Sequence, residues 1–310
     1  MTIDLKKVKT YSIKQRFSKV ERGSFAKVCR KGSGFAAFLK SLPNILKARD
    51  LKNIAEAIVK ARAKGKSVIF MMGAHVIKCG LNPLLIDLLK KKLITCVCLN
   101  GAGIIHDFEI AHMGRTSEDV AMNLKDGKFG MGRETAEFIN AAVTTGVKNG
   151  LGLGYAVASS INESRLPYKN SSLLSNAYKY KAGVCVHVAI GTDIIHQHPS
   201  FDAASTGLGS QRDFQQLTEE VAGLNNGGVV LNFGSAVILP EVFLKALNLS
   251  RNLGYKVKDF VTVNFDMIYH YRPALNLVAR PTQGSGRGYY IVGHHEIMLP
   301  LLHRAIIEYV

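Results

Sequence analysis

Four apolar runs in the sequence each end in a cluster of glycine with ionisable or amide residues. These runs occupy residues 68–75, 94–107, 184–193 and 228–235. Their length and composition are typical of buried parallel strands, and helical periodicity follows them. In open α/β sheets, ligands bind just outside the carboxyl ends of the strands. The sequence therefore predicts one shared site at these four ends, and an enzyme rather than a scaffold.

The third of these ends carries the densest group of ionisable residues, with Asp193, His196 and His198 close to Pro199. Imidazoles titrate near neutral pH and serve as acid/base groups or as metal ligands. Asp193 is well placed to accept hydrogen bonds from a ribose or an amine. Histidines beside a proline turn are also frequently structural. We take His196 and His198 as the candidate proton-transfer residues.

The first strand end offers an anion site, and the second offers a turn at which a ligand could approach the backbone closely. His75 and Lys78 lie one helical turn apart at a predicted helix start, which attracts anions; the alternative is a capping histidine and a solvent-facing lysine. The glycines of Asn100–Gly103 would let a ligand approach the backbone. His106 and Asp107 follow this turn and either belong to the site or anchor a loop.

The remaining candidates come later in the chain. Gly234 and Ser235, at the fourth end, could line a cofactor. Glu241 and Asp266 are the acids that we expect to hold a cationic substrate, although an acid at a helix start such as Glu241 is also favoured by the helix dipole. His294 begins a predicted helix, where capping is the alternative to a site role.

Several motifs argue against other chemistries. The sequence contains no GxSxG, HExxH or CxxC pattern, so we expect no metal site. The glycines of residues 150–154 predict a bend rather than a phosphate loop. Cys96 and Cys98 alternate along a predicted strand and would face the same way, which suits small core residues; a metal pair or a disulfide is the alternative.

Composition sets the broad class. The 310 residues are 47% hydrophobic and 20% charged, which is ordinary for a globular protein. No apolar run reaches the roughly 18 residues of a membrane span, and there is no signal-peptide core, so we expect no membrane partner and a cytoplasmic location.

The net charge of +17 is concentrated at the start of the chain. Residues 1–66 hold 18 Lys/Arg against four Asp/Glu, whereas the rest is nearly balanced. Such a leader could bind nucleic acid or pack on an acidic neighbouring subunit. Aromatic residues are widely spaced in it, so nucleic-acid binding through residues 1–66 is not favoured.

Strand and helix patterns alternate along the chain. They predict an α/β fold with a doubly wound, mainly parallel, Rossmann-like sheet. We divide the chain into a basic N-terminal arm with helices, residues 1–65, and a Rossmann-like catalytic domain, residues 66–310. The predicted strands are 67–73, 93–99, 184–190, 228–232 and 258–264, and the predicted helices are near 81–91, 106–112, 133–147, 212–224, 240–253 and 299–307.

The order of several short motifs resembles the deoxyhypusine synthase family over roughly Gly73–Leu302. The motifs are Gly73–Gly80, Asn100–Phe108, Thr192–Asp193, Pro240–Gly254, Val263–Asn264, Ala279–Pro281 and Pro300–Leu302. The resemblance implies an NAD-binding Rossmann-like sheet and a homotetramer with sites between subunits. It also implies oxidation of spermidine, and transfer of an aminobutyl group through an imine on a lysine to a translation factor.

The resemblance also implies a set of cofactor-binding residues. Because His75, Lys78, His106 and His294 make the pocket more cationic than the family's, NADP is an alternative to NAD. The cofactor-binding residues that we expect are Ala74, His75, Lys78, Asn100, Gly101, Ala102, His106, Asp193, Gly234, Ser235, Asn264 and His294.

The sequence departs from the family where the imine-forming lysine belongs. That lysine follows the Ala-Arg-Pro element beside a tryptophan, but this chain has no Trp and no Lys after Lys258. Residues 282–288 occupy the stretch instead. We therefore expect an NAD-dependent transferase that oxidises a polyamine or related amine and passes an alkyl group to an unknown acceptor. The alternatives are a metal-assisted hydrolase using His196 and His198, and a non-catalytic ligand- or RNA-binding relative.

Overall fold

The computed structural model describes residues 2–310 and contains a six-stranded sheet in which every strand is parallel to its neighbours. The strand order is β3-β2-β1-β4-β5-β6, so the order reverses between β1 and β4. The strands are β1 Val68–Met72, β2 Cys96–Asn100, β3 Gly183–His187, β4 Val229–Phe233, β5 Val261–Asp266 and β6 Arg287–Val292.

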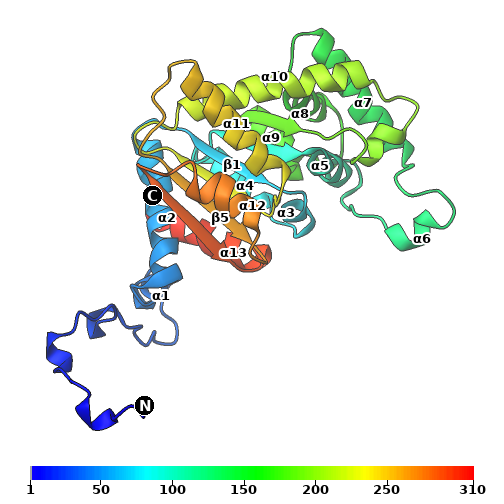
Figure 1. Ribbon diagram of the computed structural model, residues 1–310. Coiled ribbons are helices and arrows are strands. Elements are labelled where there is room, and N and C mark those ends of the chain that lie inside the picture. Colours follow the sequence, from blue (N-terminus) through cyan, green and yellow to red (C-terminus); the bar gives the residue numbers. More distant parts are fainter. Residues whose placement is uncertain (1) are drawn as a thin grey trace.

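Helices cover both faces of this sheet (Figure 1). The α-helices are α1 Phe35–Ser41, α2 Leu46–Ala63, α3 His75–Lys78, α4 Asn82–Lys90, α5 Gly101–Met113, α6 Val120–Leu124, α7 Arg133–Lys148, α8 Leu153–Glu163, α9 Leu173–Lys179, α10 Ala203–Ala222, α11 Ile238–Asn252, α12 Tyr271–Pro273 and α13 His295–Ile307. A π-helical turn, η6, spans Ala274–Ala279, and short 3-10 turns cover η1 Leu5–Lys7, η2 Ile13–Gln15, η3 Arg22–Ser24, η4 Lys169–Ser171 and η5 Ile194–Gln197.

The two faces of the sheet are buried by different helices because successive side chains of a strand point in opposite directions. In β1, Val68, Phe70 and Met72 pack in the core that contains residues of α2, α4, α5, α8, α9 and α13. Ile69 and Met71 pack on the opposite face, beneath α10 and α11. Burial on both faces explains why β1 reads as an unbroken apolar run.

The predicted α/β, Rossmann-like, parallel sheet is confirmed, but several predicted boundaries are wrong. The third strand ends at His187, not at residue 190, and α10 begins at Ala203 because the Asp202 carboxylate caps it by accepting from the Ser205 amide at 2.6 Å. The sequence reasoning missed β6, an edge strand whose apolar run is short, covers only residues 289–292, and includes a single fully buried residue, Ile291. It also missed α8 and α9.

The N-terminal arm differs from the helices that follow it. Residues 2–34 contain only short 3-10 turns and extend away from the sheet (Figure 1). In contrast, α2 packs Leu51, Ile54 and Ile58 into the core. The division of the chain at residue 65 stays a prediction.

Within residues 2–310, no helix combines the length and the apolar character that crossing a membrane requires.

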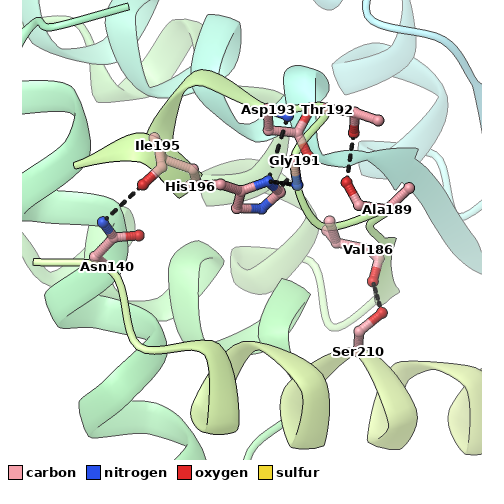
Figure 2. A network of polar contacts seen from close by, with 9 residues as sticks. All are labelled: Asn140, Val186, Ala189, Gly191, Thr192, Asp193, Ile195, His196 and Ser210. Carbon is pink, nitrogen blue, oxygen red and sulfur yellow. Dashed lines mark hydrogen bonds and ion pairs between the residues drawn. The ribbon is translucent and has the colours of Figure 1, made fainter. Parts of the chain in front are cut away.

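A buried carboxylate completes the hydrogen bonding of the edge strand β3. One oxygen of Asp213, on α10, accepts from the backbone amides of Val186 and Gly154, each at 2.7 Å. The Ser210 hydroxyl, on the same helix, donates to the Val186 carbonyl at 3.2 Å (Figure 2). Burial raises the pKa of Asp213 to about 8. A side chain on Gly152 would overlap this carboxylate, so the glycine-rich stretch 150–154 forms a bend that lets α8 and α10 approach.

We predict that Asp213→Ala destabilises the protein by about 2–5 kcal/mol, because it leaves two buried amides without acceptors. Asp213→Asn should cost under about 1 kcal/mol, since an amide oxygen still accepts and the native carboxyl is largely neutral at pH 7. Urea unfolding at pH 7 measures both variants. Equal losses for the two would show that hydrogen bonding to the strand is not what Asp213 contributes.

Candidate functional site

The carboxyl ends of five strands place one row of residues along the edge of the sheet, on the face that α10 and α11 cover. The strand registers order this row as His187, Asn100, Gly73, Gly234 and Asp266, from β3 to β5. The two glycines follow β1 and β4, the strands between which the order reverses. This is the position at which sheets of this order bind dinucleotides.

The two central glycines lie where protein atoms pack closely around the backbone. A Cβ on Gly73 would lie 2.8 Å from the Gly234 carbonyl oxygen. Gly234 itself has φ +70°, and a Cβ there would lie 2.5 Å from Nε2 of His295. No larger residue fits either place without displacing its neighbours, so the close packing of β1, β4 and His295 requires glycine at both positions.

Buried polar atoms without a partner gather around this row. Natural proteins pair nearly all such atoms, so an accumulation of them marks where a polar ligand would supply the missing partners. Among the residues that the structure describes, these atoms include Asn100 Oδ1, His187 Nε2, Asp193 Oδ2, His196 Nε2, Asn232 Oδ1, Asn264 Nδ2, Asp266 Oδ2 and His295 Nδ1. Four further atoms of this kind belong to residues that we do not assign to the site: Asn82 Oδ1, His112 Nδ1, Asp213 Oδ1 and Thr262 Oγ1.

Asp193 lies directly against the first turn of α5. A side chain on Gly101 would overlap its carboxylate. Burial raises the pKa of Asp193 to about 6, although a hydrogen bond from the Ala102 amide opposes the shift. The carboxylate therefore faces the start of a helix, where a negative charge is stabilised, and keeps one oxygen free.

His196 holds the loop that carries Asp193 (Figure 2). Its Nδ1 accepts from the backbone amides of Gly191 at 3.1 Å and of Asp193 at 3.3 Å. The hydrogen-bond pattern thus assigns the ring proton to Nε2, which lies 3.8 Å from Oδ2 of Asp193. Burial lowers the pKa of His196, so the ring is neutral at pH 7.

A cavity of about 220 Å³ lies beside Asp193, between α3, α5 and the loop that follows β3. Four predicted cofactor residues line it: Lys78, Ala102, His106 and Asp193. A second hollow adjoins it and shares Glu109, Ser117, Glu118 and Ile194 with it. The structure therefore brings one predicted residue of α3, two of α5 and one of the third strand end to one cavity.

A hydrogen-bonded chain forms one wall of this cavity. His106 Nδ1 lies 2.6 Å from the Thr116 hydroxyl, which donates to Glu109, and the other oxygen of Glu109 accepts from Thr135 at 3.3 Å. Burial opposes the ionisation of Glu109, but the hydrogen bonds with His106 and Thr116 outweigh it and lower the pKa of this carboxyl. The cavity thus presents a lysine, an imidazole and ionised acids to a ligand.

The other predicted cofactor residues lie at the switch in strand order or in the rows behind it. Ala74 and His75 follow Gly73, and Ser235 follows Gly234; the Ser235 hydroxyl accepts from the Leu239 amide at 3.2 Å. Asn264 lies one row back on β5, where its side-chain oxygen accepts from Asn232 at 2.6 Å.

Three further predicted residues, His198, Glu241 and His294, belong neither to the lining of the cavity beside Asp193 nor to the row at the strand ends. His198 is engaged by Ser200, whose hydroxyl lies 2.8 Å from Nδ1. Glu241 is paired with Lys245, with Arg272 at 3.0 Å, and with Asn276 at 2.6 Å. His294 is exposed and lies 3.9 Å from Glu296. Asp266, in contrast, is in the edge row, where one oxygen accepts from the Met267 amide at 2.8 Å and the other is free.

Sequence reasoning missed His295, His187 and Asn232. His295 is 1% exposed and lies against Gly234, with its ring centroid 6.0 Å from that of His75; burial lowers its pKa. Burial also lowers the pKa of His187, to about 4. The available signal for His187 and Asn232 was a polar residue inside an apolar run. His295 had a weaker signal, because it directly follows His294 at a helix start.

No protein-family model matches the sequence, and no curated protein is detectably similar to it. Solved structures share the fold. ArgZ, an arginine dihydrolase from the ornithine-ammonia cycle in cyanobacteria, is 17% identical with a TM-score of 0.56, over 86% of this chain and 34% of ArgZ. A ternary complex of AgrE with ornithine and NAD+ is 15% identical with a TM-score of 0.51, over 86% of this chain and 34% of AgrE.

A protein from Entamoeba histolytica, described as a candidate deoxyhypusine synthase, matches over nearly its full length. It is 11% identical with a TM-score of 0.53, over 97% of both chains. Our chain spans about a third of the length of ArgZ and AgrE. The chain therefore has the Rossmann-like fold that deoxyhypusine-synthase-like proteins share with these larger enzymes.

We predict that Asp193→Asn stabilises the protein relative to wild type by about 1–3 kcal/mol at pH 7, and that this difference disappears near pH 4. The folded carboxyl keeps its proton up to a pKa of about 6, whereas the unfolded one loses it near 4. Wild type thus loses stability as the pH rises through this window, and the variant lacks the titrating group.

Urea unfolding of both proteins between pH 4 and pH 7 measures this difference. Asp126→Asn is the control, since this aspartate is exposed and the variant keeps Asp193. Its difference in stability from wild type should therefore stay constant across this pH range. A constant difference between wild type and Asp193→Asn across this range would contradict the buried, ligand-free carboxyl that we describe.

Proposed function

We propose that the protein is an NAD(P)-dependent enzyme that oxidises a polyamine or related amine and transfers an alkyl, aminobutyl-type group to an acceptor. The observation that carries the proposal is the row of unpartnered buried polar atoms around the strand-order reversal. Gly73 and Gly234 directly follow β1 and β4 at this reversal, where sheets of this order bind a dinucleotide. AgrE, which has a similar fold, binds NAD+ and the amine-bearing molecule ornithine together.

The cavity supplies residues that would hold a dinucleotide. The free oxygen of Asp193 would accept hydrogen bonds from ribose hydroxyls, and Lys78 with His106 would face phosphate charge. Backbone at Gly73 and Gly234 would lie against the pyrophosphate. When bound, the nicotinamide would supply a hydride acceptor.

The residues beyond the reversal would hold the amine. Asp266 keeps one buried oxygen free, and Asn264 presents an unpartnered amide nitrogen beside it on β5. A buried, unpaired carboxylate is costly, so a bound cation would stabilise Asp266. Glu241 stays a second proposed contact, although the substrate would have to compete with Lys245 and Arg272 for it.

Oxidation of an amine removes a hydride from carbon and a proton from nitrogen, so the site needs a base. His196 and His198 stay our sequence-based proposals for this role. His295 is a further candidate, because its neutral ring lies at the strand-order reversal with Nδ1 unpartnered. A neutral imidazole can accept this proton as a general base.

The proposal includes a homotetramer, as the resemblance implies. The arm supports this part because it exposes large apolar side chains, including those of Ile3, Phe17 and Val28. A neighbouring chain would cover them.

No observation favours the metal-assisted hydrolase. Within residues 2–310, no third His, Cys, Asp or Glu joins His196 and His198 in a group that could hold a metal ion. An RNA-binding role has only the basic charge of the arm to support it.

We predict micromolar binding of NADP+ or NAD+ by the purified protein, and a roughly tenfold or greater loss for NADP+ in Lys78→Ala, since charge-assisted hydrogen bonds contribute about 1.5–3 kcal/mol. Isothermal titration calorimetry measures both. Lys60→Ala is the matched control, because Lys60 lies on α2 in a hollow at the amino edge of the sheet. Absence of dinucleotide binding to wild type, or an equal loss of NADP+ affinity in Lys60→Ala, would refute the placement of the dinucleotide beside Lys78.

We predict that the protein forms no deoxyhypusine from spermidine, NAD+ and a translation-factor substrate. Residues 282–286 contain no lysine and precede β6, so they lie at the amino edge of the sheet, opposite the row at the carboxyl ends. Borohydride reduction followed by peptide mass spectrometry tests for a trapped imine. An adduct on Lys78 or Lys245 would show that another lysine has taken the covalent role.

A further inference from the structure

Three thiols converge on the face of the sheet that α10 covers. Sγ of Cys96 lies 3.8 Å from Sγ of Cys98 and 3.8 Å from Sγ of Cys185, and all three sulfurs lie within 4.8 Å of one another. Each of these cysteines is 0% exposed. Cys98 pairs in register with Cys185 on β3 and with Met71 on β1, so a thioether lies beside the thiols in the same row.

The surroundings of this cluster are apolar. Leu217 and Val221 of α10 and Phe243 of α11 belong to the same buried core. Two buried acids, Glu220 and Asp213, interact electrostatically with Cys96, and burial raises the pKa of Glu220 to about 7. Hydrogen bonds with Cys96 and Cys98, together with burial, raise the pKa of the Cys185 thiol well above its usual range. Three thiolates could coexist here only around a cation.

The spacing of the sulfurs suits a common metal ion. Tetrahedral zinc with Zn–S bonds of about 2.3 Å places its sulfur ligands about 3.8 Å apart, the separation found for both pairs that involve Cys96. Sulfur atoms in van der Waals contact have a similar spacing, so the proposal rests on the types of ligand atom that are brought together. Three thiols and a thioether on adjacent strands are the ligands that thiophilic ions select.

We propose that Cys96, Cys98 and Cys185 bind one thiophilic d10 metal ion, Zn2+ or Cu+. Each coordinating thiol gives up its proton to solvent as the ion binds. The ion would tie β2 to β3 beneath α10, at positions before the carboxyl-end row, and would thus have a structural role. Because the thiols are fully buried, it would enter as the chain folds.

The test is the metal content of the full-length protein, purified without chelator and with a phosphine reductant. The protein is produced in cells supplied with zinc and, separately, with copper, and the metal is measured after unfolding. We expect about one equivalent of metal per chain in the zinc-supplied or the copper-supplied protein. The metal content should fall at least fivefold in Cys98→Ala and in Cys185→Ala. Cys79→Ala and Cys29→Ala are matched controls and should keep the metal, since neither residue belongs to the cluster.

Native mass spectrometry of wild type guards against variants that fail to fold. It should show the chain with one bound ion, which is lost when acid protonates the thiols. A metal content below about a tenth of an equivalent in both the zinc-supplied and the copper-supplied protein would overturn the proposal. Metal that is lost from the control variants but retained in Cys98→Ala would also overturn it. Metal lost in His198→Ala but retained in the cysteine variants would also overturn it and would support a histidine site.

Discussion

The arrangement of this molecule depends on the close backbone contact between β1 and β4 at their carboxyl ends. The amide of Gly73 donates to the Phe233 carbonyl at 2.9 Å, and neither Gly73 nor Gly234 has room for a side chain. Strand order runs outward from this pair in both directions, so the connecting helices separate on either side of it. At the carboxyl edge, Asn100 ends β2 on one side of this pair and Asp266 ends β5 on the other.

Buried polar groups distinguish the parts that hold the fold from the parts available to a ligand. Asp107 accepts hydrogen bonds from Asn82, Ser172 and the amides at the start of α9, and so ties α4, α5 and α9 together. Asp213 does the same for β3. In both cases protein donors offset part of the cost of burial. Asp193 and Asp266, like Asp213, keep one buried oxygen free, but theirs lie at or just beyond the carboxyl ends of β3 and β5, and this position underlies our assignment of the site to the carboxyl edge.

Much of this arrangement could be predicted from the sequence, because it rests on local patterns. Apolar runs located β1, β2 and β4, and the glycines and polar residues that close them located the edge row. Contacts between distant segments could not be read in this way. The hydrogen bond from the Gly191 amide to His196 depends on the path of the backbone after β3. The ion pair of Glu241 with Arg272 depends on how α12 packs against α11. The cysteine cluster could not be predicted either, because it depends on the register of β3 against β2. This register brings Cys185 beside Cys96 and Cys98, which the sequence indicated were core residues.

The central claim is that a dinucleotide binds along the carboxyl edge, across the reversal in strand order. A crystal structure of the protein grown with NAD+ and with NADP+ tests it most directly. We expect the pyrophosphate over Gly73 and Gly234 and a ribose within hydrogen-bonding distance of Asp193. Density for the dinucleotide at the amino edge of the sheet, or a fully occupied crystal form with an empty carboxyl edge at saturating cofactor, would contradict it.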